Sequence, residues 1–467
     1  MLINFSKVKG KLSETKLEER CNNFSEVSEN YTEERAMREA MRCLKCRDKP
    51  CCLKGCPINQ QIPEFIAKVS VGEFEEAYKI IKQRSALPAI CGRICPHESQ
   101  CEGACVRKYC GDAVGIGSLE RFVADWYANN CDGSVDTKEG IVKNKKNVAI
   151  IGAGPSGLTC AGDLLNMGYN VTIYDSYSKA GGVLAYGIPQ FRLPKHVLER
   201  EIKILENKGV KFVFNTTVGK DMMIKELISK YDAVYISNGA NEPVTMDIPG
   251  KDLEGVYSAF DYLRTINEVD IKTSDDISKL DIPKAKKIFI IGGGNVAIDC
   301  ARSARRVGAE VTIIYRRGFE EMPAFRGEII EAQEEGVNLM LLTDTVEVLG
   351  DENGKVRGIK CIKMILGDQI DSTGRLRPVK VEGSEFEIEA ECVIMAVGSG
   401  ADHNLTNGVE FEKNRKGYIV TNVNKQTSIS KVFAGGDTVT GPLTVVRAMG
   451  DGKKAAVSID AYIKSMA

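Results

Sequence analysis

The sequence lacks several features that would point to common functional classes. It has no long hydrophobic run, since the apolar stretches around Val148 and Ile288 soon end at glycine-rich turns, far short of the roughly 20 residues that span a bilayer. It has no charge excess, because 63 Lys and Arg residues nearly cancel 64 Asp and Glu residues, so no nucleic-acid or acidic-lipid partner is expected. No apolar signal segment follows the opening MLINFSKVKG. We therefore expect a soluble, cytoplasmic protein without a membrane partner.

Histidine is scarce as well. His97, His196 and His403 are the only three, and they are too scattered to form a metal site. His196 follows a helix start at Lys195 and is expected to be structural or exposed to solvent. Histidine therefore provides no candidate metal ligand.

Cysteine, by contrast, is concentrated near the N-terminus. Twelve of the 16 cysteines lie at or before Cys131, which indicates a separate cysteine-rich unit within a chain long enough for two to four domains. Two runs stand out, with the spacings C-x2-C-x4-C-x4-C and C-x3-C-x5-C-x3-C. Their members are Cys43, Cys46, Cys51, Cys56, Cys91, Cys95, Cys101 and Cys105, with Cys52 beside Cys51. Eight thiolates suffice for two four-iron clusters.

Two other interpretations of these cysteines are possible. A C-x2-C pair is also typical of structural zinc sites. Disulfides would require an oxidising compartment, which the opening of the chain does not suggest. The rest of the chain decides between iron–sulfur clusters and zinc.

A near repeat occupies the remainder of the chain. The segment VAIIGAGPSGL from Val148 is echoed by IFIIGGGNVAI from Ile288, 140 residues later. Each copy predicts a strand, a glycine-rich turn, a helix and a second strand, as in dinucleotide-binding folds. In such turns the first glycine permits the bend, the second lets the backbone approach a pyrophosphate, and the third position packs helix against strand; the helix N-terminus then holds the anion. The predicted contacts are Gly152, Gly154, Pro155, Ser156 and Gly157 in the first copy, and Gly292, Gly294, Asn295 and Val296 in the second.

The two copies differ where the ribose should bind. The first ends its second strand in Asp175, a carboxylate suited to the free hydroxyls of FAD or NAD. The second has Tyr315 there, followed by Arg316 and Arg317, whose guanidinium groups can chelate a 2′-phosphate. We therefore predict FAD in the first copy and NADP(H) in the second; alternatively, the arginines are only a solvated strand end.

Electrons delivered to such a flavin need an outlet. Flavin reductases of this architecture often use a nearby dithiol, but the segment after Asp175 has no cysteine, and Cys300, Cys361 and Cys392 are far apart. The N-terminal cysteines must then take the electrons, which favours iron–sulfur clusters over redox-inert zinc. Hydride transfer between nicotinamide and flavin depends on stacking geometry rather than on an acid–base residue, so we assign no catalytic residue.

The motifs RCLKC, ALPAICGRICP and QCEGACVR, the repeat and a late VFAGGD segment resemble the glutamate synthase small-subunit family over nearly the full chain. The resemblance implies an α/β fold with two nested Rossmann-like domains after a helical iron–sulfur domain. The implied boundaries are 1–145 for the iron–sulfur domain, 146–250 and 395–467 for the FAD domain, and 251–394 for the inserted NADP(H) domain, which should contain an antiparallel meander over about 342–380. It adds FAD contacts at Gly182, Gly436, Asp437, Thr444 and Val445.

The resemblance also implies the cluster ligands. One cluster would use Cys43, Cys46, Cys51 and Cys105; the other would use Cys56, Cys95, Cys101 and the carboxylate of Glu120. Cys91 would then be spare. In relatives three residues separate the third and fourth thiols of the first run, whereas Cys51 and Cys56 enclose four, so either Cys51 or Cys52 can be the ligand. Glu120 as an ordinary surface acid is the alternative.

Within this family, the CGRICPHESQCEGACVR and IGSLERFVADW segments are most similar to the large subunits of NADH-dependent reduced ferredoxin:NADP oxidoreductases. That similarity implies a smaller flavin and iron–sulfur subunit that handles NAD(H), ferredoxin as a partner, and electron bifurcation at FAD. The alternatives are a glutamate synthase small subunit that feeds an amidotransferase subunit, or a sulfide dehydrogenase subunit. A non-enzymatic electron carrier would not need the second copy of the repeat.

Overall fold

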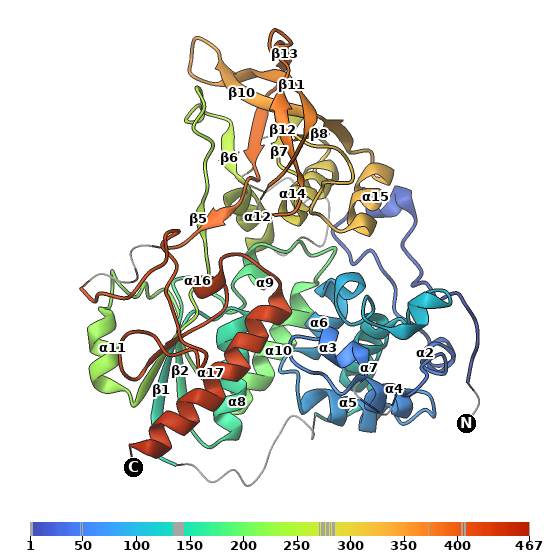
Figure 1. Cartoon of the computed structure of the whole chain (residues 1–467), viewed down its shortest axis with the longest axis vertical. Helices are drawn as coiled ribbons and strands as arrows, with labels where there is room; N and C mark the ends of the chain where they lie inside the picture. The colour runs from blue at the N-terminus through green and yellow to red at the C-terminus, as the bar shows by residue number, and fades with distance from the viewer. Residues whose placement is uncertain are drawn as a thin grey trace.

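The computed structural model describes residues 3–46, 48, 50–133, 144–269, 271, 276, 280, 282, 285–371, 373–402, 405 and 408–466; His403 lies outside these residues. Figure 1 shows a helical N-terminal part in blue to cyan, a first α/β part in green with a red C-terminal helix, and a second α/β part in yellow to orange. This is the fold class that the sequence predicts.

The N-terminal part is made of short amphipathic helices around an apolar core. Tyr78 of α5 stacks on Tyr127 of α7 with ring centroids 3.8 Å apart, and Phe74 meets Phe122 edge-on at 5.0 Å. Large aromatic rings of this kind bury much apolar surface per residue, which compensates for the shortness of the helices. The elements are α1 (Leu17–Arg20), α2 (Glu33–Ala40), α3 (Cys51–Gly55), α4 (Ile62–Val69), α5 (Phe74–Lys82), α6 (Pro88–Ile94), η1 (His97–Ser99), η2 (Val106–Tyr109) and α7 (Ile116–Asn130).

The first α/β part contains a five-stranded parallel sheet in the order β16-β4-β1-β2-β3. Its strands are β1 (Asn147–Ile151), β2 (Asn170–Tyr174), β3 (Lys211–Val213), β4 (Ala233–Ile236) and β16 (Val432–Ala434). Its helices are α8 (Pro155–Asn166), α9 (Val183–Tyr186), α10 (Lys195–Asn207), α11 (Ile224–Lys230), α16 (Asp437–Thr440) and α17 (Val445–Ser465). The start of α10 at Lys195 confirms the prediction, and His196 is exposed, as expected.

Helix α17 joins this sheet to the helical part. It packs closely on α8, because a Cβ at Gly452 would lie 2.2 Å from the Ser156 carbonyl oxygen. In Figure 1 it crosses diagonally between the first sheet and the N-terminal helices. Both parts therefore share one apolar core, which includes Met449 and Ile459 of α17 and Ile90 of α6.

The second α/β part repeats the architecture. Its five-stranded parallel sheet has the order β6-β14-β7-β8-β9, and β7 (Lys287–Ile291) begins and ends 140 residues after β1, as the repeat predicts. The short strands β5 (Glu242–Pro243) and β15 (Ser399–Gly400) pair antiparallel where the chain leaves and re-enters the first part. The remaining elements are β6 (Val256–Ser258), α12 (Ala259–Glu268), α14 (Asn295–Arg306), β8 (Glu310–Tyr315), α15 (Arg326–Glu334), β9 (Asn338–Leu341) and β14 (Cys392–Met395).

A separate antiparallel sheet extends from the second part. It is formed by β10 (Thr343–Gly350), β11 (Val356–Ile370), β12 (Leu376–Lys380) and β13 (Phe386–Glu389). The antiparallel pairings of β11 with β10, β12 and β13 confirm the predicted meander.

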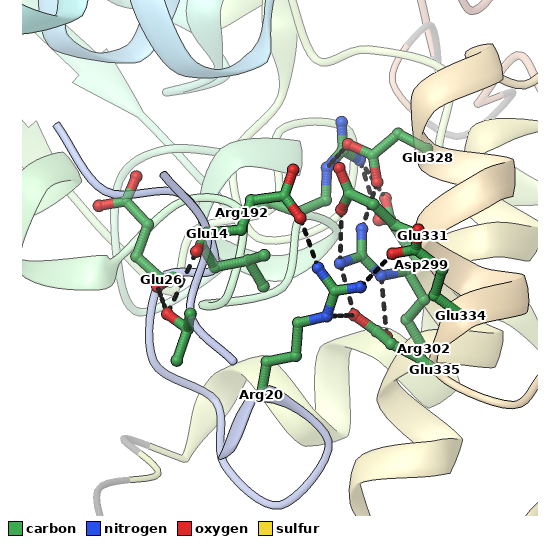
Figure 2. A network of polar contacts seen from close by, with 12 residues as sticks. Glu14, Arg20, Glu26, Arg192, Asp299, Arg302, Glu328, Glu331, Glu334 and Glu335 are labelled. Carbon is green, nitrogen blue, oxygen red and sulfur yellow. Dashed lines mark hydrogen bonds and ion pairs between the residues drawn. The ribbon is translucent and has the colours of Figure 1, made fainter. Parts of the chain in front are cut away.

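An ionic network fixes the three parts relative to one another (Figure 2). Arg20, from the N-terminal segment, pairs with Glu14 at 2.6 Å and lies 3.7 Å from Glu335 at the end of α15. Arg192, from the first α/β part, pairs with Asp299 of α14 at 2.8 Å. Arg302 of α14 pairs with Glu335 at 2.8 Å, and both side chains are almost fully buried. Removing one partner of such buried pairs is strongly destabilising, so these contacts hold the second sheet in one orientation.

Among the residues that the structure describes, no helix combines the length and apolar character needed to cross a membrane.

Candidate functional site

Five cysteines line one pocket in the N-terminal part: Cys43, Cys46, Cys51, Cys52 and Cys105. We call four of them, Cys43, Cys46, Cys52 and Cys105, the outer cysteine group. They come from the loop after α2, from α3 and from the start of η2. Apolar side chains, among them Ile62, Ile66 and Ile116, form the rest of the wall. A sulfur-lined, apolar pocket fits an iron–sulfur cluster, whose ligands are thiolates.

The structure distinguishes Cys52 from Cys51. Both line the pocket, but Cys51 is exposed and Cys52 is partly buried. Burial, followed by the nearby thiols of Cys43, Cys105 and Cys46, raises the pKa of Cys52 to about 12. A thiol with several sulfur neighbours is poised to share a cluster with them, because binding to the metal removes its proton. Of the two candidates that the sequence leaves open, Cys52 is the one with sulfur neighbours.

A second set, the inner cysteine group, consists of Cys56, Cys95 and Cys101 with Cys91 beside them. A hydrogen bond with Cys91, followed by burial, holds the pKa of Cys95 well above its usual range. Burial and the charge of Glu102, followed by Cys56 and Glu120, do the same for Cys101. The structure therefore brings together the three thiols that were predicted to share the second cluster.

Cys91 lies closer to this group than the sequence prediction of a spare thiol suggested. It is buried, its Sγ lies 3.5 Å from Met449 Sδ of α17, and it contacts Cys95. Cys91 and Cys95 are four residues apart on α6 and its C-terminal end. This separation places two side chains on one face of a helix, and it is the signal that could have revealed their contact.

Glu120 is buried in the middle of α7, beside the inner group. One carboxylate oxygen, Oε1, has no hydrogen-bond partner among the described residues. Burial raises the pKa of Glu120 to about 8, against a hydrogen bond with Gln60. A buried carboxylate without a compensating cation is costly, so the residues fit a metal centre at this point. Glu120 is not the surface acid of the alternative interpretation.

A zinc ion and a four-iron cluster require different spacings of their ligands. Within the described part of the chain, no group of three or more His, Cys, Asp or Glu residues converges closely enough to hold a single metal ion. A zinc ion needs its four ligands about 2.0–2.3 Å from one centre. In a four-iron cluster each thiolate binds a different iron, so the ligands stand farther apart.

The inner group faces the first α/β part. Gln100, beside Cys101, donates from Nε2 to Thr444 Oγ1 at 3.3 Å. A Cβ at Gly450 of α17 would lie 3.0 Å from the carbonyl oxygen of Pro57, the residue after Cys56. Thr444 and Val445 begin α17 and are predicted FAD contacts. The inner group thus lies next to the predicted flavin site.

The first glycine-rich turn has the geometry that a pyrophosphate needs. Gly152 has φ +100°, and a Cβ there would lie 2.4 Å from the Ser237 carbonyl oxygen. Gly154 is the N-cap of α8, with open space where a Cβ would be. Pro155 is the first residue of α8, Ser156 Oγ bonds Tyr235 OH at 2.7 Å, and Gly157 packs on Gly152. The turn therefore offers an open helix N-terminus to an anion.

Other predicted FAD contacts surround this turn. Asp175 accepts hydrogen bonds from the Ala153 N–H at 2.7 Å and the Tyr177 N–H at 2.9 Å, and burial raises its pKa. A Cβ at Gly182 would lie 3.0 Å from Gly154 Cα, and one at Gly436 would lie 3.1 Å from Ser156 Cβ. Burial raises the pKa of Asp437 to about 6. Segments far apart in the sequence thus meet at one site.

The second turn repeats this geometry. Gly292 has φ +142°, and a Cβ there would lie 2.3 Å from the Ala396 carbonyl oxygen. Gly294 is the N-cap of α14. Asn295 accepts a hydrogen bond from the Phe325 N–H at 2.9 Å through Oδ1, and Val296 is 49% exposed. An exposed apolar side chain beside an open helix N-terminus is consistent with a bound nucleotide covering it.

The structure places the two predicted arginines differently. Arg316, at the end of β8, is exposed. Arg317 is only 4% exposed; its guanidinium pairs with Asp371, and its Nε donates to the Leu376 carbonyl at 2.9 Å. Both arginines follow the end of β8, and only Arg316 has an exposed side chain that is open to a phosphate.

Two family models match this chain. The model described as dihydropyrimidine dehydrogenase domain II, 4Fe-4S cluster, matches residues 20–131. The pyridine nucleotide-disulphide oxidoreductase model matches residues 146–452, and also 125–222. The glutamate synthase (NADPH) small chain of Azospirillum brasilense is 37% identical over 456 residues, which are 96% of this chain and 93% of that protein. The chain belongs to the glutamate synthase small-chain family.

A further relative and a solved structure are also similar to this chain. The NADP(+)-dependent formate dehydrogenase subunit beta of Moorella thermoacetica is 39% identical over 436 residues, 88% of this chain but 60% of that protein. The structure of Mycobacterium tuberculosis FprA in complex with NADPH matches 69% of this chain and 85% of its own, with a TM-score of 0.57 and 20% identity, and shows the fold alone. As a member of this family, the chain is an NAD(P)H-dependent flavin oxidoreductase with a 4Fe-4S domain.

Proposed function

We propose that this chain passes electrons between NADP(H), FAD and two [4Fe-4S] clusters, in that spatial order. The observation that carries the proposal is the contact of the inner cysteine group and its neighbour Gln100 with the first turns of α17. FAD, when bound, supplies hydride exchange with the nicotinamide and one-electron exchange with the clusters. The proposed domains are the iron–sulfur domain at 1–145, the FAD domain at 146–250 and 395–467, and the NADP(H) domain at 251–394.

The residues of the chain position the cofactors. Gly152, Gly154 and the N-terminus of α8 would hold the FAD pyrophosphate, with Asp175 near the ribose. Gly292, Gly294 and the N-terminus of α14 would hold the pyrophosphate of NADP(H). The outer group would hold one cluster. The inner thiols Cys56, Cys95 and Cys101 with Glu120 would hold the other, and a carboxylate, being a harder ligand than a thiolate, would change the potential of that cluster.

We further propose that the chain is the large subunit of an electron-bifurcating NADH-dependent reduced ferredoxin:NADP oxidoreductase. Its partners would be a smaller flavin and iron–sulfur subunit that handles NAD(H), and ferredoxin. Exposed apolar side chains beside the outer group support a protein partner there: Leu44, which lines the pocket, is 41% exposed, and Tyr109, on η2, is 79% exposed. Exposed aromatic and aliphatic side chains of this kind are typical of interaction sites.

A second candidate function comes from a relative. The Azospirillum brasilense protein is named a glutamate synthase small chain and matches over nearly its full length, so the partner could instead be a large amidotransferase subunit. Isolating the native complex and identifying its second subunit separates the two. A small flavoprotein supports bifurcation, whereas an amidotransferase subunit would contradict it.

The phosphate assignment is tested by Arg316→Ala. We expect it to weaken NADPH binding by about ten- to hundredfold, because a charge-assisted contact contributes about 1.5–3 kcal/mol. NADH binding should change little, since NADH has no 2′-phosphate. The affinities are compared on the holoprotein with the oxidised forms, NADP+ and NAD+, which cannot reduce the flavin, by isothermal titration calorimetry. Equal losses for the two nucleotides would mean that Arg316 supports the fold.

The ligand role of Glu120 is tested by Glu120→Cys. Iron content should stay the same while the midpoint potential of one cluster shifts, because thiolate replaces a harder oxygen donor. The measurement is a redox titration followed by electron paramagnetic resonance. The control is Asn129→Cys, at the exposed end of α7, which should shift neither potential. Two unchanged potentials in Glu120→Cys would exclude Glu120 and make Cys91 the better candidate.

A further inference from the structure

We propose that Arg375, from the hairpin between β11 and β12, is a specificity-determining residue that binds the 2′-phosphate of NADP(H) together with Arg316. The inference rests on the proposed binding of NADP(H) at the second glycine-rich turn. Arg375 takes the place of Arg317 as the second phosphate contact, because the guanidinium of Arg317 has other partners.

The position of Tyr315 identifies the ribose end of the site. It follows the second turn as Asp175 follows the first, 140 residues earlier. Its ring packs against the turn, because a Cβ at Gly293 would lie 2.6 Å from a ring carbon. Its hydroxyl donates to the Glu321 carbonyl at 2.7 Å. In dinucleotide-binding folds the side chain at this strand end meets the ribose hydroxyls.

The guanidinium of Arg375 reaches this point. Its Nη1 lies 3.3 Å from Tyr315 OH and 3.4 Å from the Glu321 carbonyl oxygen, and its Nε donates to Thr373 Oγ1 at 2.8 Å. Each of these three partners is neutral, and Arg375 makes no ion pair with any residue that the structure describes. A half-buried cation beside the ribose position is suited to a phosphate, because guanidinium–phosphate contacts are charge-assisted.

Arg317 acts as the positioning residue for this hairpin. It contacts both sides of the turn, through Asp371 before Arg375 and the Leu376 carbonyl after it. Asp371 Oδ1 in turn accepts from the Thr373 N–H at 2.8 Å and the Arg375 N–H at 3.3 Å. These hydrogen bonds, led by those from Thr373, lower the pKa of Asp371 to about 2. Asp371 therefore stays ionised, and its ion pair with Arg317 offsets part of its negative charge.

Two acidic side chains near the site have basic neighbours. Glu320 pairs with Arg326. Arg316 lies near Asp344, whose pKa is raised by burial and lowered by Arg316. Arg316 directly follows Tyr315 in the chain, and Arg375 reaches the Tyr315 hydroxyl from a hairpin turn.

The test compares NADP+ and NAD+ binding to the holoprotein by isothermal titration calorimetry. Arg375→Ala should weaken NADP+ by about tenfold or more and leave NAD+ unchanged, while Arg375→Lys should retain part of the preference. The control is Arg377→Ala, an exposed arginine on β12, which should change neither affinity. Thermal unfolding of each variant shows whether the fold is intact, and Arg375→Lys tests the role if the alanine variant is unstable.

The outcomes separate this inference from the proposed function. If Arg316→Ala loses the preference for NADP+ and Arg375→Ala keeps it, Arg375 is not a phosphate contact and the proposed function stands. If Arg375→Ala weakens both nucleotides equally, Arg375 shapes the fold and the inference is wrong. If the wild-type protein binds NAD+ as tightly as NADP+, the NADP(H) assignment itself fails.

Discussion

We expect Cys52→Ser to lower the iron content from about eight to about four atoms per chain, whereas Cys51→Ser should keep about eight. The reason is the difference in position: Cys52 is partly buried among Cys43, Cys46 and Cys105, and Cys51 is exposed. A serine oxygen is a poorer ligand than a thiolate for an iron–sulfur cluster. Iron and acid-labile sulfide are measured on anaerobically purified protein, with flavin content as an internal reference.

A matched control and a contrary result make this comparison decisive. Cys110→Ser, at an exposed cysteine that follows η2, should keep both clusters. The electron paramagnetic resonance signal that survives in Cys52→Ser should belong to the cluster of the inner group. Loss of iron in Cys51→Ser with full retention in Cys52→Ser would reverse the assignment.

The second large effect is expected at the two helix N-caps. Gly154→Val should abolish FAD binding and leave NADPH binding to the second turn, while Gly294→Val should do the opposite. Neither glycine has a positive φ, and at both positions a Cβ would meet no described atom closer than 4.0 Å. The folded chain can therefore accept a side chain there, but a pyrophosphate that approaches the backbone cannot.

The readouts are flavin content for the first site and NADPH binding by calorimetry for the second. Circular dichroism checks that both variants fold. If Gly154→Val retains FAD at wild-type level, the first turn does not hold the pyrophosphate. If each variant loses both nucleotides, the two turns are coupled and the assignment of one cofactor to each turn is wrong.

The two dinucleotide folds could be predicted because their signals are local. A strand, a glycine turn and a helix occupy about 20 consecutive residues. Strands β1 (Asn147–Ile151) and β7 (Lys287–Ile291) begin and end at the same 140-residue offset as the repeat. The meander was equally accessible from its alternating pattern. The family resemblance added the nested order, which no local pattern contains.

The choice between Cys51 and Cys52 could not be predicted, because it depends on the orientation of one helix. Both are the first residues of α3, and successive residues of an α-helix differ by about 100° in direction. Their spacing to Cys46 and Cys56 allows either one. Only the packing of α3 against the pocket shows which thiol has sulfur neighbours.

The partners of the arginines could not be predicted, because they are distant in the sequence. Arg317 pairs with Asp371, 54 residues away, and Arg20 pairs with Glu334, 314 residues away. Nothing in the local sequence of YRRG distinguishes an exposed arginine from one that anchors a hairpin. The same distance hides Arg375, which reaches Tyr315 from 60 residues away.

The most direct test of the central claim is an anaerobic titration of the purified chain with NADPH, followed by electron paramagnetic resonance. We predict that NADPH bleaches the flavin and that signals from two distinct [4Fe-4S] clusters appear, in protein with about eight irons and one FAD per chain. Stoichiometric zinc with little sulfide would contradict the claim. The claim would also be contradicted if dithionite reduced the clusters of FAD-loaded protein and NADPH, at any concentration, did not.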